Sequence, residues 1–229
     1  MKRSWIVAAI VAVLSLAVVN TAHAQMGMDI FKRPSITKAF HPVVGKGAAY
    51  LSTNKSGGTH DMEIGIVGKE SADGKEGFWM EFVSSVNNGK QMVGKVLITT
   101  GDFEFRRMVF QQPGQQAMEM PMNMMGAARK EKMEDRLGEW HSVGTESVTV
   151  PAGTFSCEHW RNDKTHGEVW TSDKVTPSGL VKEVSPNGET EVLVKILDSF
   201  PDRITGPVKQ FDMQQMMQEM QQRRQQPQQ

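Results

Sequence analysis

Methionine is crowded into one short stretch of the chain, at Met118, Met120, Met122, Met124 and Met125. Thioether sulfur is a soft ligand, and copper(I) is a soft cation that such ligands bind. Methionine also fills irregular apolar cavities and adapts to ligands of different shape. The stretch therefore predicts either a copper(I) site or, as the preferred interpretation, a flexible apolar lid over a binding surface.

A second group that could hold a metal ion lies at a predicted hairpin. Cys157 and His159 alternate along one strand and so point to the same face. A hairpin turn after this strand would place Glu168 opposite His159, with His166 nearby. Such residues bind zinc, but a slip of one residue in the register would scatter them. The alternative interpretation is that Cys157 is a small buried core residue.

The motifs of several enzyme classes are missing from the sequence. There is no Gly-x-Ser-x-Gly elbow, no His-Glu-x-x-His pair, no phosphate-binding loop and no glycine fingerprint of a dinucleotide site. Glu131, Glu134 and Asp135 fall on a short predicted helix and have the pattern of an ordinary solvated face. We therefore expect a protein that is not an enzyme and that needs no cofactor.

The N-terminal residues have the three parts of a secretory signal peptide. Lys2 and Arg3 form a basic start, residues 5–19 an apolar run, and Ala22-His23-Ala24 a cleavage site. The run is shorter than the about 20 apolar residues that span a bilayer. We expect cleavage after Ala24 and a periplasmic or secreted protein. The next residue is Gln25 and not the cysteine that lipidation requires, so no membrane anchor is expected.

Residues 25–229 carry almost no net charge. Loss of Lys2 and Arg3 leaves 24 basic residues against 26 acidic ones, so nucleic acid is not an expected partner. Cys157 is the only cysteine, so no disulfide can form within the chain. The length predicts one domain over residues 25–207. Residues 208–229 are rich in Gln and Met and predict a low-complexity tail.

Alternation of apolar and polar residues predicts about ten strands. The stretches between them contain Asn-Gly, Asp-Gly and Pro-Ala-Gly, which favour the tight turns that join antiparallel neighbours. A sheet with so many strands is expected to curl strongly, because this limits exposed edges. The predicted strands cover residues 48–53, 60–68, 77–86, 91–99, 103–111, 146–150, 155–162, 167–172, 180–185 and 190–199.

The alternation assigns one apolar face to this sheet. The positions that share it are Met62, Ile64, Ile66, Phe78, Met80 and Phe82, with Glu81 on the opposite face. The pattern of residues 103–111 is ambiguous, because Arg107 shares the parity of Phe103 and Phe105. Residues 112–125 are predicted as a Met-rich loop and residues 126–137 as a short charged helix. Together they form a predicted lid insert.

Three stretches of the second half occur together: Val-Pro-Ala-Gly-Thr-Phe at residues 150–155, Val-Trp-Thr-Ser at 169–172 and Gly-Leu-Val-Lys at 179–182. In these stretches the chain resembles the lipoprotein-carrier-like (LolA/LolB-like) superfamily, and more narrowly a group of secreted bacterial proteins with the same first hairpin. The likeness covers most of residues 45–200. It implies an antiparallel sheet that curls into a half-barrel around a helical lid and encloses an apolar cavity for acyl chains. It carries no catalytic residue over to this chain.

Taken together, these features predict a mainly β protein that works outside the cytoplasm. The preferred function is a soluble periplasmic binding protein or carrier for a hydrophobic, lipid-like ligand such as an acyl chain. The six apolar residues that share one face of the sheet are its predicted lining, and the alternative for each of them is a place in a sealed core. The alternatives are a Met-rich protein that handles copper(I), and a non-catalytic structural or interaction protein of the envelope.

Overall fold

The computed structural model of the chain describes residues 38–86, 90–101, 103–120 and 140–212, and within them every regular element is a β-strand. The first half contains β1 (Gly47–Thr53), β2 (Thr59–Ala72), β3 (Lys75–Val86), β4 (Lys90–Thr99), β5 (Phe105–Gln111) and β6 (Met118–Met120). The second half contains β7 (Trp140–Val150), β8 (Gly153–Asn162), β9 (Glu168–Thr171), β10 (Leu180–Val184), β11 (Thr190–Leu197) and β12 (Lys209–Gln210). The described ranges hold no helix that could cross a membrane.

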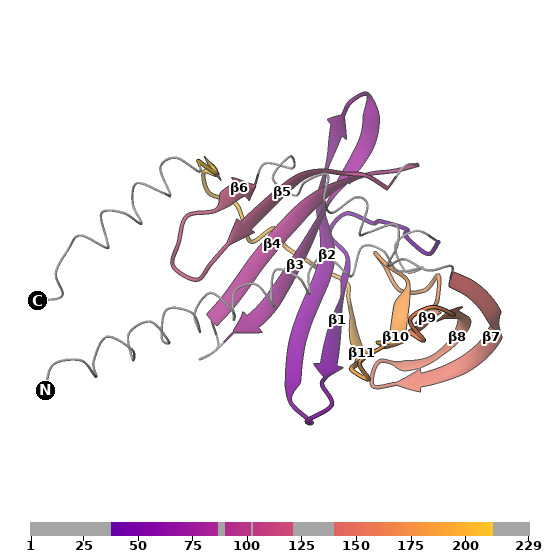
Figure 1. Ribbon diagram of the computed structural model, residues 1–229. Coiled ribbons are helices and arrows are strands. Elements are labelled where there is room, and N and C mark those ends of the chain that lie inside the picture. The colour runs from indigo at the N-terminus through magenta and orange to yellow at the C-terminus, as the bar shows by residue number, and fades with distance from the viewer. Residues whose placement is uncertain (1–37, 87–89, 102, 121–139, 213–229) are drawn as a thin grey trace, which may run out of the picture.

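All twelve strands belong to one sheet, in the order β12-β6-β5-β4-β3-β2-β1-β11-β10-β9-β8-β7 (Figure 1). Neighbouring strands are antiparallel except β12, which runs parallel to β6. The pairing of β1 with β11 joins the two halves of the chain. The mainly β prediction is confirmed. The strands outnumber the predicted ten because β6 and β12 are too short to show an alternating pattern.

Side chains that cap the turns explain why consecutive strands pair. In the β1–β2 turn, Asn54 Oδ1 accepts hydrogen bonds from the backbone N–H groups of Ser56 (3.0 Å) and Gly58 (2.9 Å). Between β8 and β9, Asn162 Oδ1 accepts one from the N–H group of Thr165 at 3.0 Å. Asn favours turns because its side chain replaces a backbone acceptor. The predicted hairpins follow from this local chemistry.

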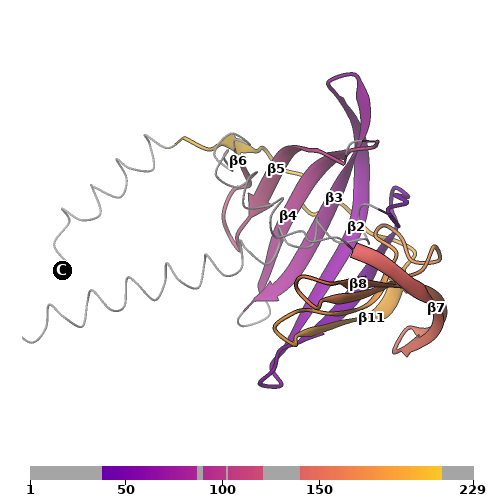
Figure 2. The ribbon, with the colours of Figure 1, turned by 45° about the vertical axis from the view of Figure 1, so that its right-hand side comes forward.

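The sheet is curled but not closed (Figure 1, Figure 2). The β7–β8 hairpin turns back, so that β7 lies against β10 and β11. The N–H group of Ala152, in the β7–β8 turn, donates to the carbonyl of Leu193 in β11 at 3.3 Å. The two terminal strands of the described sheet, β7 and β12, do not pair with each other. The predicted half-barrel is confirmed as an open, strongly curled sheet.

The larger core cluster joins both halves of the sheet. Its members in β1 to β4 define what we call the inner face, and full burial of each larger side chain contributes about 1.5–3 kcal/mol. These members are Ala48, Tyr50, Met62, Ile64, Ile66, Phe78, Met80, Val96 and Ile98. The second half of the chain contributes Val150, Phe155, Cys157, Val169, Trp170, Val175, Leu180, Val181 and Leu193.

The opposite, outer face has a core of its own, and here the prediction of a single apolar face is wrong. Its buried members are Val83, Val93, Val109, Ala117, Phe200 and Ile204. Phe200 and Ile204 belong to the segment of residues 198–212, which we call the strap. The strap follows β11, crosses the outer face and ends beside β6 (Figure 1).

Two glycines make room for the strap. Gly47 in β1 and Gly65 in β2 are register partners. A Cβ atom at Gly65 would lie 2.3 Å from the ring of Phe200, and one at Gly47 would lie 2.8 Å from it. The missing side chains form what we call the glycine socket, which buries the Phe200 ring. The guanidinium carbon of Arg203 lies 4.5 Å from the centroid of this ring, a cation–π contact.

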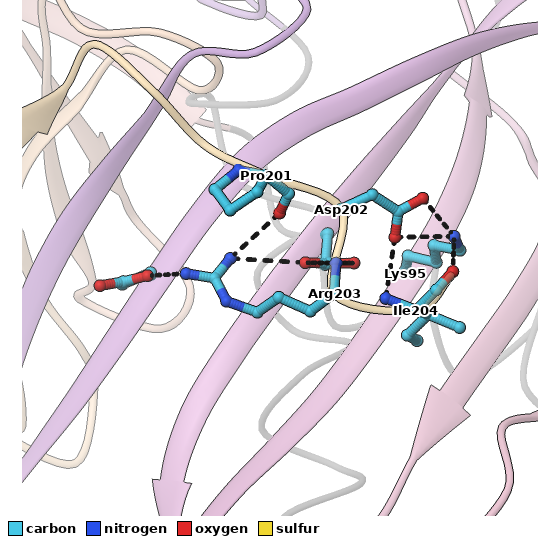
Figure 3. A network of polar contacts seen from close by, with 7 residues as sticks. Lys95, Pro201, Asp202, Arg203 and Ile204 are labelled. Carbon is cyan, nitrogen blue, oxygen red and sulfur yellow. Dashed lines mark hydrogen bonds and ion pairs between the residues drawn. The ribbon is translucent and has the colours of Figure 1, made fainter. Parts of the chain in front are cut away.

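Polar contacts fasten the strap to the strands beneath it (Figure 3). Lys95 Nζ, from β4, donates to Asp202 Oδ2 at 2.9 Å and to the carbonyl of Ile204 at 3.0 Å. The side chain of Arg203 reaches β2, where Nη2 donates to Glu63 Oε2 at 2.5 Å. The strap is thereby tied to strands that lie more than a hundred residues earlier in the chain.

Glu81 is the buried carboxyl group at the centre of this network. Its side chain is 0% exposed. Both of its oxygens accept a hydrogen bond from the backbone N–H group of Arg203, each at 3.2 Å. Burial raises the pKa of Glu81 to about 7, against the effect of the Arg203 hydrogen bond, and the neighbouring Asp202 raises it further. Glu81 therefore lies opposite the inner-face residues, as predicted, but beneath the strap.

The predicted loop over residues 112–125 is wrong for Met118–Met120, which form β6. An ion pair on the outer face explains how so short a strand is held. Arg107 Nε and Nη2 donate to the two carboxylate oxygens of Glu119, at 2.7 and 3.0 Å. Arg107 Nη1 donates to Glu70 at 2.8 Å. Paired guanidinium and carboxylate groups of this kind add both energy and geometric specificity.

A bulge resolves the ambiguous pattern of residues 103–111. Phe105 and Arg107 pair with successive residues of β4, so Arg106 is an extra residue in β5. The parity therefore changes at Arg106. Phe105 and Met108 both pack against the inner core, while Arg107 points to the outer face.

Several predictions concern residues outside the described ranges. They are the signal peptide with its cleavage after Ala24, the helix over residues 126–137, and most of the Gln- and Met-rich tail. Met122, Met124 and Met125 also lie outside. These remain predictions.

Candidate functional site

The residues that the sequence assigns to ligand binding form one continuous wall on the inner face. Ile64 pairs with Phe82 and Ile66 with Met80, so β2 and β3 contribute side by side. Phe82 is half-buried, and the other predicted lining residues are at most 9% exposed. The six are Met62, Ile64, Ile66, Phe78, Met80 and Phe82.

A neighbouring glycine accommodates the ring of Phe82. Gly94 in β4 is the register partner of Phe82, and a Cβ atom at Gly94 would lie 2.3 Å from the Phe82 ring. On the far side of Gly94 its partner in β5 is Phe110. The two half-buried rings therefore flank a strip without a side chain, which extends the apolar wall from β3 to β5.

All six methionines within the described ranges lie on this inner face. Val96 is the register partner of both Met80 and Met108, and Met108 is directly opposite Met120. Partners in neighbouring strands share a face, which fixes the side on which each one lies. The wall from β2 to β6 is thus rich in flexible, polarisable side chains. The six are Met62, Met80, Met92, Met108, Met118 and Met120.

A polar pocket of about 200 Å³ opens at one end of the inner face. Four of its lining residues are register partners in neighbouring strands: His60 of β2, Ser52 of β1, Glu191 of β11 and Glu183 of β10. His60 is two residues from Met62 on the same strand, so the two share a face. The inner face therefore passes from an apolar wall into an acidic pocket.

Tyr50 lies between the wall and the pocket and is buried. Its hydroxyl donates to the carbonyl of Leu180 at 3.2 Å and lies 3.4 Å from Ser178 Oγ. Burial raises the pKa of Tyr50 above its ordinary value; the nearby charge of Glu191 acts in the same direction and the Ser178 hydroxyl opposes it. Tyr50 is therefore a neutral hydroxyl that ties β1 to β10.

The predicted zinc ligands assemble only in part. His159 pairs with Trp170 and Glu168 with Arg161, so the predicted register is wrong. The side chains of His159 and Glu168 are nevertheless close, with His159 Nε2 3.7 Å from Glu168 Oε1. His166 is exposed and has a positive φ of 61°. Within the described ranges no group of three His, Cys, Asp or Glu side chains could hold a metal ion.

His159 instead stacks on Trp170, with ring centroids 4.3 Å apart and an interplanar angle of 16°. His159 Nδ1 lies 3.2 Å from Glu146 Oε1, which also accepts a hydrogen bond from the indole N–H group of Trp170. Cys157, two residues before His159, is buried. Burial and the charge of Glu146 raise the pKa of its thiol to about 11. The thiol is therefore un-ionised at neutral pH, which suits a core residue and not a nucleophile.

Comparison with known proteins finds weak structural likeness. No protein-family model and no curated protein matches the chain. It is similar to a candidate lipoprotein of Parabacteroides distasonis ATCC 8503, at 14% identity and a TM-score of 0.35, over 69% of this chain and 97% of that one. It is also similar to a candidate exported protein with a YmcC-like fold from Bacteroides fragilis NCTC 9343, at 14% identity and a TM-score of 0.37, over 69% and 98% of the two chains.

A third similar structure is that of MucB in complex with MucA(peri). It shares 10% identity at a TM-score of 0.38, over 72% of this chain and 53% of that one. At these identities and TM-scores, none of the three structures assigns a family or a function to the chain.

Neither the polar pocket nor the strap was predicted from the sequence. For the pocket, one signal was available: Ser52 and His60 occupy inward positions of their strands next to a turn. For the strap, the signal was the pair Gly47 and Gly65, because glycine within a strand often marks the close approach of another segment. Both signals can be interpreted only when it is known which strands pair.

Proposed function

We propose that the protein is a non-catalytic binding protein of the cell envelope that holds an amphipathic, lipid-like ligand against the inner face of its half-barrel. One observation carries the proposal: along this face an apolar wall passes into a polar pocket. The wall, with the half-buried rings of Phe82 and Phe110, suits an acyl chain, whose burial is driven by the hydrophobic effect. The pocket suits a polar headgroup, because binding sites combine apolar walls with a few converging polar groups.

The side chains of the pocket favour particular headgroups. Glu183, Glu189 and Glu191 line it together with His60. Carboxylates accept hydrogen bonds and repel anions. A headgroup with hydroxyl or ammonium donors therefore fits this end of the face better than a phosphate or a free carboxylate does.

The chemistry of two reactive groups supports a non-catalytic role. The hydroxyl of Tyr50 is buried and hydrogen-bonded to the carbonyl of Leu180. The thiol of Cys157 is buried and has a raised pKa. Neither is an activated nucleophile, which would need a lowered pKa or an adjacent base.

Two measurements test this function. The first is mass spectrometry of organic extracts from protein purified gently out of its own cellular compartment, for which we expect co-purified lipid at about one equivalent. The second is displacement of a fluorescent monoacylglycerol, whose headgroup offers hydroxyl donors and no carboxylate, compared between F82A and V83A. Phe82 and Val83 are neighbours in β3 but face opposite sides of the sheet. F82A should weaken binding about tenfold, equivalent to about 1.4 kcal/mol, and V83A should bind normally.

Either of two results would count against the proposal. One is a wild-type protein that carries no lipid and does not bind the fluorescent monoacylglycerol. The other is an equal loss of affinity in F82A and V83A, because a ligand on the inner face does not touch Val83.

A further inference from the structure

The geometry points to a soft-metal site on the β5–β6 hairpin, in which the thioethers of Met108, Met118 and Met120 bind one copper(I) ion. Strand pairing, and not closeness in sequence, brings Met108 to the other two. This site does not depend on the lipid-like ligand proposed above, because its three methionines are not among the six predicted lining residues and the polar pocket lies on β1, β2, β10 and β11.

The register of the hairpin sets the spacing of the three donors. Met120 is directly opposite Met108, and Met118 is opposite Phe110. Direct partners have Cβ atoms about 4.5–5.5 Å apart, and residues two apart on a strand lie about 7 Å apart. Methionine has three rotatable side-chain bonds. Three sulfur atoms on this frame can therefore converge on a single ion.

The other side of the hairpin keeps this frame rigid. Glu119, between the two methionines of β6, points to the outer face, where Arg107 binds both of its carboxylate oxygens. Gln210 Nε2 of β12 donates to Glu119 Oε2 at 2.9 Å. The flexible side chains of Met118 and Met120 therefore extend from β6, a strand that β5 holds on one edge and β12 on the other.

The surroundings of the three methionines favour a soft ion over a hard one. All three side chains are half-buried, so an ion can enter without unfolding of the core. Val96 and Phe110, the register partners of Met108 and Met118, are apolar and supply no oxygen ligands. Calcium and magnesium need several oxygen ligands, whereas thioethers select copper(I).

One positive charge lies beside the site. Lys209 of β12 is the register partner of Met118 and is exposed. Its long side chain can extend its ammonium group into water. Thioethers are neutral, so bound copper(I) keeps its single positive charge. Its repulsion from the ammonium group of Lys209 is weak and is screened by salt.

Titration of the mature protein with copper(I), under reducing conditions and against a chromophoric copper(I) chelator, tests the assignment. We expect one ion bound with a Kd of about 1 μM or tighter. M108L and the double variant M118L/M120L should each weaken binding about tenfold or more, equivalent to about 1.4 kcal/mol. Leucine keeps the volume and removes the sulfur. M62L and M80L, which change methionines sealed in the same wall, are the matched controls and should bind as the wild type does.

Three results would overturn the site. The first is wild-type binding weaker than about 1 μM. The second is unchanged affinity in M108L together with loss of binding in M122L/M124L/M125L. The third is an X-ray absorption spectrum of the bound copper that shows nitrogen or oxygen neighbours where a sulfur shell is expected. Circular dichroism of each variant confirms that a loss of affinity is not a loss of fold.

Discussion

Replacing Glu81 by Gln tests whether the strap covers a carboxyl group that keeps its proton near neutral pH. Glu81 is 0% exposed, and burial raises its pKa from 4.5 to about 7. One pKa unit corresponds to about 1.4 kcal/mol of stability, so the shift amounts to about 3 kcal/mol. Gln keeps an oxygen for the N–H group of Arg203 but has no proton to lose.

Proton binding fixes the sign of the effect. Below pH 4.5, Glu81 carries its proton in the folded and the unfolded chain. Between pH 4.5 and about 7 the unfolded chain releases the proton while the folded chain keeps it. The free energy of unfolding therefore falls with rising pH, and the loss is complete above the folded pKa. The stability of E81Q relative to the wild type should rise by about 3 kcal/mol over this range.

The assay is urea unfolding followed by tryptophan fluorescence at about pH 4.5, 6 and 8. Val83 lies in the same strand and the same outer core, and V83A removes apolar contacts without removing a titratable group. V83A should lose about 2 kcal/mol at every pH. A relative stability of E81Q that stays flat or falls as the pH rises would refute the reasoning. It would mean that Arg203 holds Glu81 ionised in the folded protein.

Three further predictions concern the socket, the edge and the only tyrosine. G65V should destabilise the fold by about 2–3 kcal/mol in the same urea assay, because its Cβ would lie 2.3 Å from the Phe200 ring; G206A, with nothing within 4 Å of its Cβ, should be neutral. R107A should lower the free energy of unfolding by about 1 kcal/mol, since the Arg107–Glu119 ion pair is partly solvated. It should also speed hydrogen exchange at the backbone amides of β6. Unchanged protection of these amides would contradict the role given to Arg107. Tyr50 is the only tyrosine, so alkaline titration by ultraviolet absorbance reports on it alone. No phenolate should form near the ordinary pKa of about 10 while the protein stays folded, and a normal titration would show that Tyr50 is accessible.

The hairpins could be predicted from the sequence because they depend on neighbouring residues. Asn54 caps the β1–β2 turn through atoms only two and four residues away. The inner face was also predictable, because Met62, Ile64 and Ile66 alternate without interruption over one strand. Turn chemistry and a period of two are local properties. These local properties predict which consecutive strands pair and on which face of the sheet each residue lies.

The outer core could not be predicted in this way. On the outer face Val83 lies two residues from Glu81, and Val93 lies two residues from Lys95, so the pattern resembles a solvated surface. The strap buries these positions. Its residues Arg203 and Asp202, more than a hundred residues later in the chain, form hydrogen bonds with Glu81 and Lys95. Pairings at such distances leave no periodic signal.

The candidate site was predictable in part for the same reason. The wall follows from alternation within β2 and β3. The pocket depends on the pairing of β1 with β11, which sets Ser52 beside Glu191. The hairpin thioethers depend on the bulge at Arg106, which returns Met108 to the inner face. Neither the long-range pairing nor the bulge can be read from residue types alone.

The strap follows in sequence every strand that it covers, and this sets a limit on when those strands can finish folding. The contacts of Phe200 and Arg203 join it to strands made more than a hundred residues earlier. Until residue 204 has left the ribosome, Val83, Val93 and Val109 have no cover on the outer face. Contacts of such long sequence separation slow folding. A chain still in synthesis therefore stays incompletely folded, the condition in which a polypeptide can be threaded through a narrow pore.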